Sequence, residues 1–479
     1  MKERREVEKK RFSLEPSVKR IYKIDVCDPQ DGSLIARVPG MNGEEVDAAV
    51  ERAQKGVQIA RSLPSHRRMA ILRKAADIVE ERAESFAVTI AREGSKTIRE
   101  ARKEVFRCVE TLRISAEEAR RIRGETIPFD QAAGSEQRVG YYVRFPVGLI
   151  AAITPFNDPL NLVAHKVGPA IAAGNAIIVK PASVTPLSAL KLAEVMREAG
   201  LPDLVLTVVT GHGREIGQRL VQHPAVRMVS FTGGWEAGEE IHRLMGLKKV
   251  SMELGSNSPA IVLSDADLDE AVECTVSGAF WAAGQNCLGV QRIFVEEKVF
   301  EKFAQMFVQR TLQYRVGDKC SEETDMGPLI TEKEARRVER WVQEAVDAGA
   351  RLLCGGRRNG AYYHPTVLTN VPAYCKVARE EVFGPVVSLF PVSGLEEAIQ
   401  RANEVDYGLQ AGIFTRDVHQ AFEAVQRLEA GGVMVNDSSD YRVDAMPFGG
   451  IKGSGLGREG VPFAVQEMTE TKVVCFRLG

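Results

Sequence analysis

Short apolar runs alternate with amphipathic segments over most of this 479-residue chain. Between Gly43 and about Arg123, apolar residues such as Val46 and Val50 recur at steps of three and four, which predicts amphipathic helices. Further along, a helical segment separates each of five apolar runs from the next: Gly148–Ile153, Ala176–Lys180, Asp203–Val209, Met228–Phe231 and Lys249–Glu253. This alternation predicts a parallel sheet covered by helices.

The same alternation resumes after Glu253 and predicts a second α/β unit. Its expected strands are Ala260–Leu263 and Arg292–Glu296, and its expected helices are one from Asp265, capped by Ser264, to about Ala283, one from about Val299 to Tyr314, and one from Lys333 to Gly349. Six glycines between residues 449 and 460 predict an irregular loop there.

Two further segments favour contact with another subunit. Alternating runs around Ala133-Gly134-Ser135, within Glu125–Phe145, predict a β-hairpin that projects from the main body. The tail Thr469–Leu478 is expected to be an unpaired strand, whose edge a partner could use. We therefore expect a homodimer or a homotetramer. Residues 1 to about 20 are rich in charge and are expected to form a solvated arm.

Composition narrows the possible partners and the compartment. The chain carries 63 basic and 65 acidic residues, for a net charge of −2, so neither nucleic acid nor an anionic membrane is expected to bind it. No run reaches the roughly 18 apolar residues that a membrane span needs, and no signal-peptide pattern follows Met1, so we expect a cytoplasmic protein. Eight cysteines without a C-x-x-C pair and seven unclustered histidines predict neither a disulfide framework nor a metal site.

Cys287 is the candidate nucleophile, because it lies among small residues in Gly284–Gln291. The alternative for a single cysteine is ordinary buried packing. Asn157 and Glu253 are the groups that could assist a thiol chemically. Asn157 could instead cap a helix before Pro159, and Glu253 could be an ordinary carboxylate at a strand end. Glu253 stands in an apolar stretch, however, where an unpaired charge is costly, and this favours a functional role.

Glycines and a lysine near the ends of predicted strands indicate a nucleotide site. Gly233 and Gly238 lie between a strand and a helix, where backbone N–H groups and the helix dipole can face a phosphate. The full G-x-G-x-x-G pattern is absent, so ordinary turn glycines are the alternative. Lys180 ends another strand of the same sheet, at the edge where open α/β sheets bind ligands, and this favours the nucleotide.

Taken together, these residues resemble the aldehyde dehydrogenase superfamily over about residues 20–479. The matching segments, in the order of the family, are Pro155-Phe156-Asn157, Lys180-Pro181-Ala182-Ser183, Phe231-Thr232-Gly233-Gly234, Glu253-Leu254-Gly255, Gly284-Gln285-Asn286-Cys287, Glu381-Val382-Phe383-Gly384-Pro385 and Pro447-Phe448-Gly449-Gly450. The resemblance implies an α/β fold with a Rossmann-like cofactor domain, an α/β catalytic domain and a β-hairpin oligomerisation arm. The division expected is 1–123 with 147–252 for NAD(P), 253–458 for catalysis, and 124–146 with 459–479 for oligomerisation.

The resemblance also implies the role of each site residue. Cys287 would attack an aldehyde, Asn157 and the Cys287 N–H would stabilise the oxyanion, and Glu253 would activate the hydrolytic water, with Lys166 supporting the site. The implied cofactor-binding residues are Thr154, Pro155, Lys180, Ser183, Gly233, Gly238, Leu254, Gly255, Glu381 and Phe383. Ser183 replaces the acid that repels a 2′-phosphate in NAD-selective relatives, so both NAD and NADP are expected. Gly234 and Ser256 also depart from the usual family residues, without removing a catalytic group.

Two arginines bear on the substrate. Arg442 falls where relatives line the outer substrate pocket, and Arg107 matches a phosphate-reading position of the non-phosphorylating glyceraldehyde-3-phosphate dehydrogenase branch. Guanidinium groups suit a phosphate, sulfonate or carboxylate, so a short aldehyde with an anionic or hydroxylated tail is expected, as in the lactaldehyde-like branch. The alternative is that both arginines form structural ion pairs. The residues His165, Asn286 and Leu288 are also expected to lie at the substrate pocket.

The sequence leaves two alternative functions to consider. A CoA-acylating aldehyde dehydrogenase would pass the acyl group from Cys287 to CoA, but that branch dispenses with the base at Glu253. A non-catalytic structural protein could share the same fold. The presence of Asn157, Glu253 and Cys287 together argues against this second rival.

Overall fold

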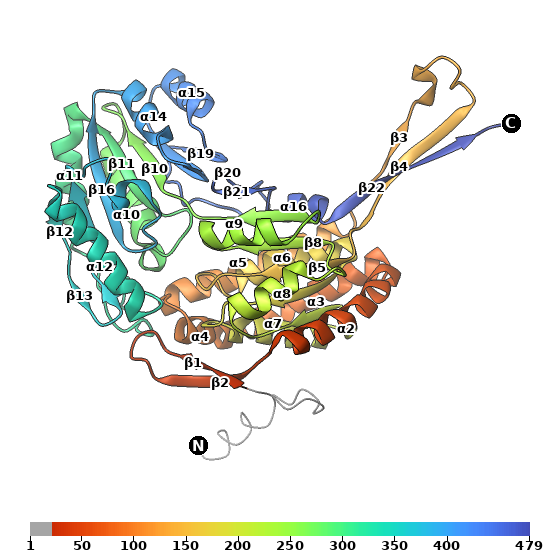
Figure 1. Cartoon of the computed structure of the whole chain (residues 1–479). Coiled ribbons are helices and arrows are strands. Elements are labelled where there is room, and N and C mark those ends of the chain that lie inside the picture. The colour runs from red at the N-terminus through yellow and green to blue at the C-terminus, as the bar shows by residue number, and fades with distance from the viewer. Residues whose placement is uncertain (1–21) are drawn as a thin grey trace.

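The computed structural model describes residues 22–479, so the arm expected over residues 1 to about 20 lies outside the described residues. Two parallel-stranded α/β layers face each other, and a narrow β arm projects from one of them (Figure 1). The mixed α/β fold expected from the sequence is therefore confirmed.

The strands and helices alternate along the chain. The strands are β1 Tyr22–Cys27, β2 Leu34–Gly40, β3 Glu125–Ile127, β4 Arg138–Pro146, β5 Leu149–Ile153, β6 Ala176–Lys180, β7 Leu206–Val208, β8 Met228–Thr232, β9 Lys249–Glu253, β10 Ser258–Val262, β11 Val290–Glu296, β12 Arg351–Cys354, β13 Arg358–Asn359, β14 Tyr362–Tyr363, β15 Thr366–Thr369, β16 Val386–Val392, β17 Tyr407–Gly408, β18 Gln410–Phe414, β19 Gly432–Val435, β20 Ile451–Lys452, β21 Gly455–Leu456 and β22 Thr469–Arg477. The helices are α2 Gly43–Ser62, α3 Ser65–Glu81, α4 Ala83–Glu93, α5 Ile98–Glu118, α6 Asn161–Ala173, α7 Leu187–Glu198, α8 Gln218–Gln222, α9 Trp235–Leu244, α10 Leu268–Phe280, α11 Glu297–Thr311, α12 Glu332–Asp347, α13 Lys376–Arg379, α14 Leu395–Asn403, α15 Val418–Arg427 and α16 Val461–Glu467. Short helical turns η2 Phe129–Gln131, η3 Gly213–Gly217 and η4 Trp281–Gly284 complete the set.

The first large sheet has six strands in the order β21-β9-β8-β5-β6-β7. Strands β5 to β9 are parallel, and β5 lies between β6 and β8, so the strand order reverses beside β5. Helices on both faces bury these strands, which is why their sequences are almost wholly apolar. The predicted strands are confirmed, with β7 shorter than the expected Asp203–Val209. A site is expected at the carboxyl ends beside this reversal.

The second large sheet has seven strands in the order β12-β15-β16-β11-β10-β18-β19, and all its pairs are parallel except β12 with β15. Helix α10 begins at Leu268 with Asp267 as its N-cap, so the expected start at Asp265 with a Ser264 cap was wrong. The Asp265 carboxylate instead accepts backbone N–H bonds from Arg416 and Asp417. The Ser264 N–H donates to Glu296, at 2.8 Å. Both residues are therefore engaged elsewhere.

The projecting arm has three antiparallel strands in the order β22-β4-β3 (Figure 1). The predicted hairpin is confirmed by the pairing of β3 with β4. The C-terminal strand was expected to be unpaired, and this was wrong, because β22 pairs with β4 from Thr469 opposite Pro146 to Arg477 opposite Arg138. One side of β22 is therefore paired with β4, and its other side is an unpaired edge of the arm.

The glycine-rich stretch 449–460 is more ordered than the irregular loop that was expected. It contains β20 and β21, and β21 adds an antiparallel strand to the six-stranded sheet by pairing Gly455 with Glu253. Gly455 has a φ of 155° and a side chain there would lie 2.3 Å from the Met252 carbonyl oxygen, so only glycine permits this approach. The glycine-rich stretch therefore pairs with the last two residues of β9, Met252 and Glu253.

Candidate functional site

A pocket of about 340 Å³ lies where the two sheet layers meet the loop after β5. Its wall includes Cys287, Asn157, Asn286, Leu288 and the two arginines Arg107 and Arg442. The structure thus brings six of the predicted catalytic and substrate residues to one cavity. The other three, Glu253, Lys166 and His165, are buried and do not line the pocket.

Cys287 lies in the loop between η4 and β11 and is partly buried against Leu288, Leu409 and Phe448. The chain reaches it through a left-handed run, with φ values of 51°, 56° and 69° at Ala282, Ala283 and Gly284. Burial and the nearby Glu381 carboxylate raise the pKa of the Cys287 thiol to about 12. The thiol therefore needs a base before it can act as a nucleophile.

Asn157 lies in the loop from β5 to α6. Helix α6 begins at Asn161 with Leu160 at its N-cap and without a side-chain cap, so Asn157 does not serve as the helix cap considered above. Its amide group belongs instead to the pocket wall that also carries Cys287. An amide N–H that faces the same cavity as a thiol is a group that can stabilise an oxyanion.

Glu253 ends β9 and is 1% exposed, and neither carboxylate oxygen has a hydrogen-bond partner among the described residues. Burial and the nearby charge of Glu459 raise the pKa of Glu253 well above its usual range. The charge of Glu253 also contributes to the raised pKa of Cys287, so the two groups interact electrostatically. A buried carboxylate with free oxygens and a raised pKa is suited to accept a proton near neutral pH.

Glu459 is a neighbour of the site that the sequence reasoning missed. Lys166 Nζ donates to Glu459 Oε1 at 2.9 Å, and Arg442 Nη2 lies 3.5 Å from Glu459 Oε2. Burial opposes ionisation of this carboxyl, but the two cations lower the pKa of Glu459 to about 2. The ionised Glu459 in turn contributes to the raised pKa of Glu253. Its isolated position in the glycine-rich stretch carried no signal in the sequence.

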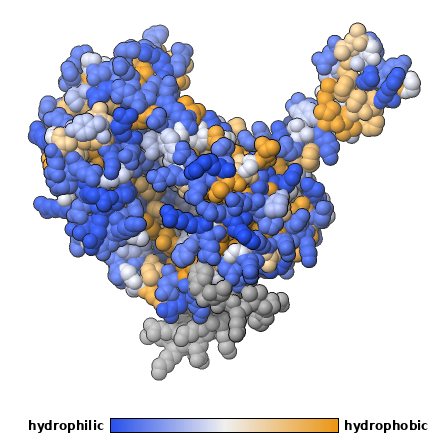
Figure 2. All heavy atoms as spheres, viewed as in Figure 1, coloured by the Kyte–Doolittle hydropathy of each residue, from blue (hydrophilic) through white to orange (hydrophobic). Residues whose placement is uncertain are grey.

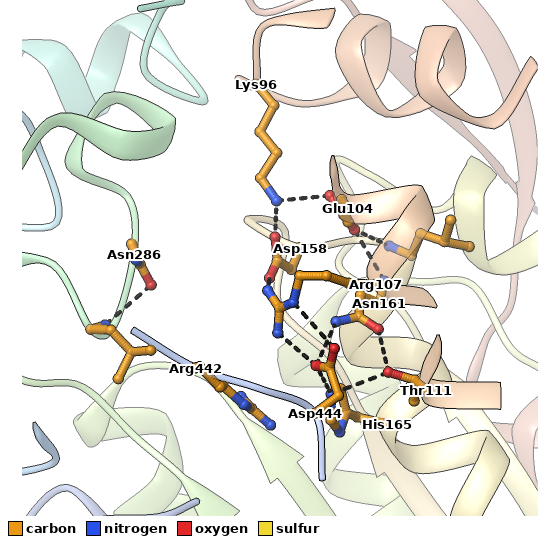
Figure 3. Close-up of polar contacts among 12 residues, drawn as sticks. Lys96, Glu104, Arg107, Thr111, Asp158, Asn161, His165, Asn286, Arg442 and Asp444 are labelled. Atoms are coloured by element: carbon orange, nitrogen blue, oxygen red, sulfur yellow. Dashed lines mark hydrogen bonds and ion pairs between the residues drawn. The ribbon is translucent and has the colours of Figure 1, made fainter. Parts of the chain in front are cut away.

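The two arginines differ in how far they are already paired (Figure 3). Arg107 Nη2 donates to Asp444 Oδ1 at 2.8 Å, and its Nη1 lies 3.5 Å from Asp158 Oδ2. The Arg442 guanidinium lies over the Phe448 ring, 3.7 Å from its centroid, and its buried Nε has no hydrogen-bond partner among the described residues. Arg442 therefore keeps one donor unpaired, whereas Arg107 is largely engaged.

His165 is held by Asp444, with 2.7 Å between Nε2 and Oδ1. Burial and the Arg442 charge lower the pKa of His165, so the ring is neutral near pH 7. Although burial opposes it, His165 and Arg107 hold the pKa of Asp444 well below its usual range. The ring does not line the pocket, and Asp444 is a second charged group that the sequence reasoning missed.

The predicted cofactor residues gather at the carboxyl edge of the six-stranded sheet. Thr154 follows β5, Lys180 ends β6, Gly233 follows β8, and Leu254 with Gly255 follows β9. Pro155 is next to Thr154, and Gly238 packs inside α9 so closely that a side chain there would lie 2.5 Å from Leu254. This edge adjoins the reversal of strand order at β5, the position where open α/β sheets bind dinucleotides.

Unsatisfied polar groups along this edge fit a nucleotide. The buried Thr154 hydroxyl has no partner among the described residues, and Lys180 Nζ donates to the Pro181 carbonyl oxygen at 2.9 Å. Burial lowers the pKa of Lys180 to about 8. Ser183 Oγ donates to the Gly211 carbonyl oxygen at 2.8 Å and places no negative charge here. A lysine with donors to spare and no nearby acid suits ribose hydroxyls or a phosphate.

Glu381 and Phe383 approach the same edge from the other layer. Glu381 accepts the Ser256 N–H at 2.9 Å, and burial raises its pKa to about 7. A side chain at Gly255 would lie 2.5 Å from Glu381 Oε2, so glycine leaves room for this carboxyl. Phe383 has a φ of 45° and meets the Phe156 ring edge-on, with 5.7 Å between the centroids. Glu381 and Phe383, from the layer of the seven-stranded sheet, thus contact residues at the carboxyl edge of the six-stranded sheet.

Membrane-spanning helices and groups of metal-binding side chains are both absent from the described part of the chain. Within residues 22–479, no helix combines the length and the apolar character that crossing a bilayer requires. In the same part of the chain, no three His, Cys, Asp or Glu side chains are grouped to hold a metal ion.

The chain is similar in sequence and in structure to known aldehyde dehydrogenases. The chain matches the Aldehyde dehydrogenase family over residues 17–474. It is 52% identical to aspartate-semialdehyde dehydrogenase 1 of Pseudomonas canavaninivorans, covering 95% of this chain and 97% of that protein. It is 48% identical to 3-sulfolactaldehyde dehydrogenase of Priestia megaterium, covering 95% of each chain. The crystal structure of glyceraldehyde-3-phosphate dehydrogenase GapN from Methanocaldococcus jannaschii, complexed with NADP, superposes with a TM-score of 0.92 at 40% identity, covering 95% of this chain and 99% of that one. The chain therefore belongs to the aldehyde dehydrogenase family and is an NAD(P)-dependent aldehyde dehydrogenase.

Proposed function

We propose that this enzyme oxidises a short aldehyde with an anionic or hydroxylated tail to the free carboxylic acid, through a thioester on Cys287. One observation carries the proposal: Cys287, Asn157 and the incompletely paired Arg442 share one pocket. The names of two relatives, aspartate-semialdehyde dehydrogenase and 3-sulfolactaldehyde dehydrogenase, refer to short aldehydes with acidic groups, which supports the same substrate class.

The first chemical step forms a bond between Cys287 Sγ and the aldehyde carbon. The thiol must first lose its proton to water, since the pKa of Cys287 is raised to about 12, and the nearby charge of Arg442 favours the resulting thiolate. Negative charge then develops on the aldehyde oxygen. The Asn157 side-chain amide and the Cys287 backbone N–H would stabilise it by hydrogen bonds.

Completion of the reaction needs a hydride acceptor and a hydrolytic base. When bound, the oxidised nicotinamide supplies the hydride acceptor. A thioester then remains on Cys287, and Glu253 removes a proton from the water that attacks its carbonyl carbon. The carboxylic acid leaves and the Cys287 sulfur is released. We place Thr154, Lys180, Glu381 and Phe383 around the cofactor, with Ser183 leaving room for NADP as well as NAD.

The decisive assay follows reduced-nicotinamide absorbance with a panel of aldehydes, both cofactors, and CoA present or absent. We expect turnover without CoA, because the buried Glu253, which influences the thiol electrostatically, can serve as the hydrolytic base. Strict dependence on CoA would favour the acylating rival, and no turnover with any aldehyde would favour the structural-protein rival. Titration of NAD against NADP in the same assay determines which cofactor the enzyme prefers.

Arg442→Ala should reduce selectivity for anionic aldehydes. The panel consists of lactaldehyde, glyceraldehyde-3-phosphate, succinic semialdehyde and a plain alkanal. We expect the ratio of kcat/KM for the anionic aldehydes to that for the alkanal to fall by about 10- to 100-fold, because a charge-assisted hydrogen bond is lost. The alkanal serves as the internal control for general damage near Glu459. Preference of the wild-type enzyme for the plain alkanal would contradict the proposed substrate class.

The projecting arm supports assembly into a homodimer or a homotetramer. Figure 2 shows apolar residues gathered on it, and the exposed ones are Val139, Tyr141, Val143, Val473, Phe476 and Leu478. Exposed apolar residues on a projecting three-stranded sheet with a free edge are typical of a subunit contact. We propose that a second copy of the chain covers these residues.

Charge on the arm should therefore dissociate the oligomer. We expect the double variant Tyr141→Asp with Phe476→Asp to shift the molar mass toward that of a monomer, because two carboxylates would be buried in an apolar contact. Light scattering after size-exclusion chromatography measures the mass. Tyr374→Asp is the matched control, since Tyr374 is 73% exposed and lies outside the arm. A monomeric wild-type protein, or a double variant of unchanged mass, would contradict the proposal.

A further inference from the structure

Helix α5 carries a row of polar residues on one buried face. Glu100, Glu104, Arg107 and Thr111 are separated by steps of four, three and four, which place them on the same side of a helix. Figure 3 shows the side chains of Glu104, Arg107 and Thr111 along this side of the helix. Charges on a buried face are costly unless they are paired, so each one points to a partner.

Glu100 is tied to the segment that leads to the nucleophile. Its Oε1 accepts the backbone N–H of Ala282 at 2.8 Å, and its Oε2 accepts the Thr97 N–H, also at 2.8 Å. Ala282 begins the left-handed run before Cys287, a conformation that alanine does not favour. Gln285 holds the other side of the same residue, because its Nε2 donates to the Ala282 carbonyl oxygen at 3.0 Å. Glu100 therefore restrains the direction from which the chain arrives at Cys287.

Glu104, one helical turn further, is tied to the loop that carries Asn157. Its Oε1 accepts the backbone N–H groups of Leu160 and Asn161, at 2.8 and 3.0 Å. Its Oε2 accepts from Lys96 Nζ at 2.8 Å, and the same ammonium group pairs with Asp158, the residue after Asn157 (Figure 3). Glu104 therefore restrains the loop of the oxyanion donor both directly and through Lys96.

We propose that Glu100 and Glu104 are positioning residues that set the placement of the Cys287 thiol relative to the Asn157 amide. Each anchors one of the two loops to the same rigid helix, four residues and hence about 6 Å apart along its axis. The oxyanion contacts depend on that placement, since small errors in the geometry of a reacting pair reduce the rate strongly. The inference rests on the proposed roles of Cys287 and Asn157.

A third carboxylate offers a matched control. Glu93 is as deeply buried as Glu100 and Glu104, and it likewise accepts backbone N–H bonds, from Leu187 at 2.7 Å and Ser188 at 2.8 Å. Those two residues begin α7, which carries none of the residues that line the pocket. Glu93 thus shares the structural role of a buried cap without contact to either catalytic loop.

The experiment compares Glu100→Gln, Glu104→Gln and Glu93→Gln at saturating cofactor. We expect kcat to fall by about 10- to 100-fold in the first two variants with KM within about threefold, because the reacting groups are displaced while substrate still binds. In Glu93→Gln we expect kcat within about twofold of the wild type, at a similar loss of melting temperature. Glutamine retains one acceptor oxygen, so the alanine variants at positions 100 and 104 should lose more kcat than the glutamine variants.

Two outcomes would overturn the inference. In the first, all three glutamine variants lose the same share of kcat for the same loss of melting temperature, which would indicate a purely structural role. In the second, KM rises while kcat is unchanged at both positions, which would indicate an effect on binding. If Cys287→Ala remains active, the proposed function fails; if it is inactive and Glu100→Gln behaves like Glu93→Gln, only the positioning role fails.

Discussion

Replacing Cys287 with alanine should reduce aldehyde oxidation by at least about 10⁴-fold, the order of loss that follows removal of an enzyme nucleophile. Cys287 and Asn157 line the same pocket, and no other cysteine lines it. Without its sulfur no bond to the aldehyde carbon can form. Reduced-nicotinamide absorbance measures the loss, and cofactor binding followed by fluorescence shows whether the variant remains folded.

Cys320→Ala is the control for this result, because Cys320 is exposed and does not line the pocket. It should keep wild-type activity. An alkylating reagent should inactivate the wild type and the Cys320→Ala variant, and mass spectrometry should find the label on Cys287 in both. Equal activity of the wild type and Cys287→Ala would contradict the mechanism.

Replacing Glu253 with glutamine should slow steady-state turnover by about 10²- to 10⁴-fold, as is typical when a general base is lost. The amide keeps the shape of the side chain but cannot take a proton from water, so the thioester on Cys287 would persist. Rapid mixing should then show a burst of reduced cofactor of about one equivalent per active site, followed by a slow phase. Mass spectrometry of the quenched protein should detect the acyl group.

The pH dependence of the same step follows from the environment of Glu253. Burial and Glu459 raise its pKa, and only the ionised carboxylate can accept a proton. The ionised fraction, and with it the rate, should therefore increase as pH rises through the raised pKa, at a higher pH than for an ordinary glutamate. This limb should be absent from Glu253→Gln. Hydroxylamine, a nucleophile that needs no general base, should restore turnover of the variant, and failure to do so would contradict the hydrolytic role.

Much of the fold followed from local patterns in the sequence. The predicted strands Ala176–Lys180 and Lys249–Glu253 coincide with β6 and β9, because a continuous apolar run must be buried on both faces wherever it lies. The start of α10 was missed because Asp265 and Ser264 find partners on Thr415 and Glu296, far away in the chain. Pairing of β22 with β4 and of β21 with β9 was missed for the same reason.

The candidate site divides in a similar way. Cys287, Asn157 and Glu253 could be selected from the sequence because their chemistry and their motifs are local. The neighbouring residues that shift their pKa values or hold their loops could not be selected in this way. Glu459 contacts Lys166, which lies 293 residues away in the chain, and Glu100 contacts Ala282, which lies 182 residues away. The spacing of Glu100, Glu104, Arg107 and Thr111 on one helical face was the signal available for part of this set.

The sequence by itself determined which groups can do chemistry and where strands and helices form, because both depend on residue types and short periods. The tertiary structure decided which carboxylates have shifted pKa values, which arginine keeps an unpaired donor, and which helix holds the loops that lead to Cys287 and Asn157. Arg107 and Arg442 look alike in the sequence, yet Asp444 engages one while the other keeps a buried Nε unpaired. The physical reason is that burial and partner charges, which set these properties, arise only when distant segments meet.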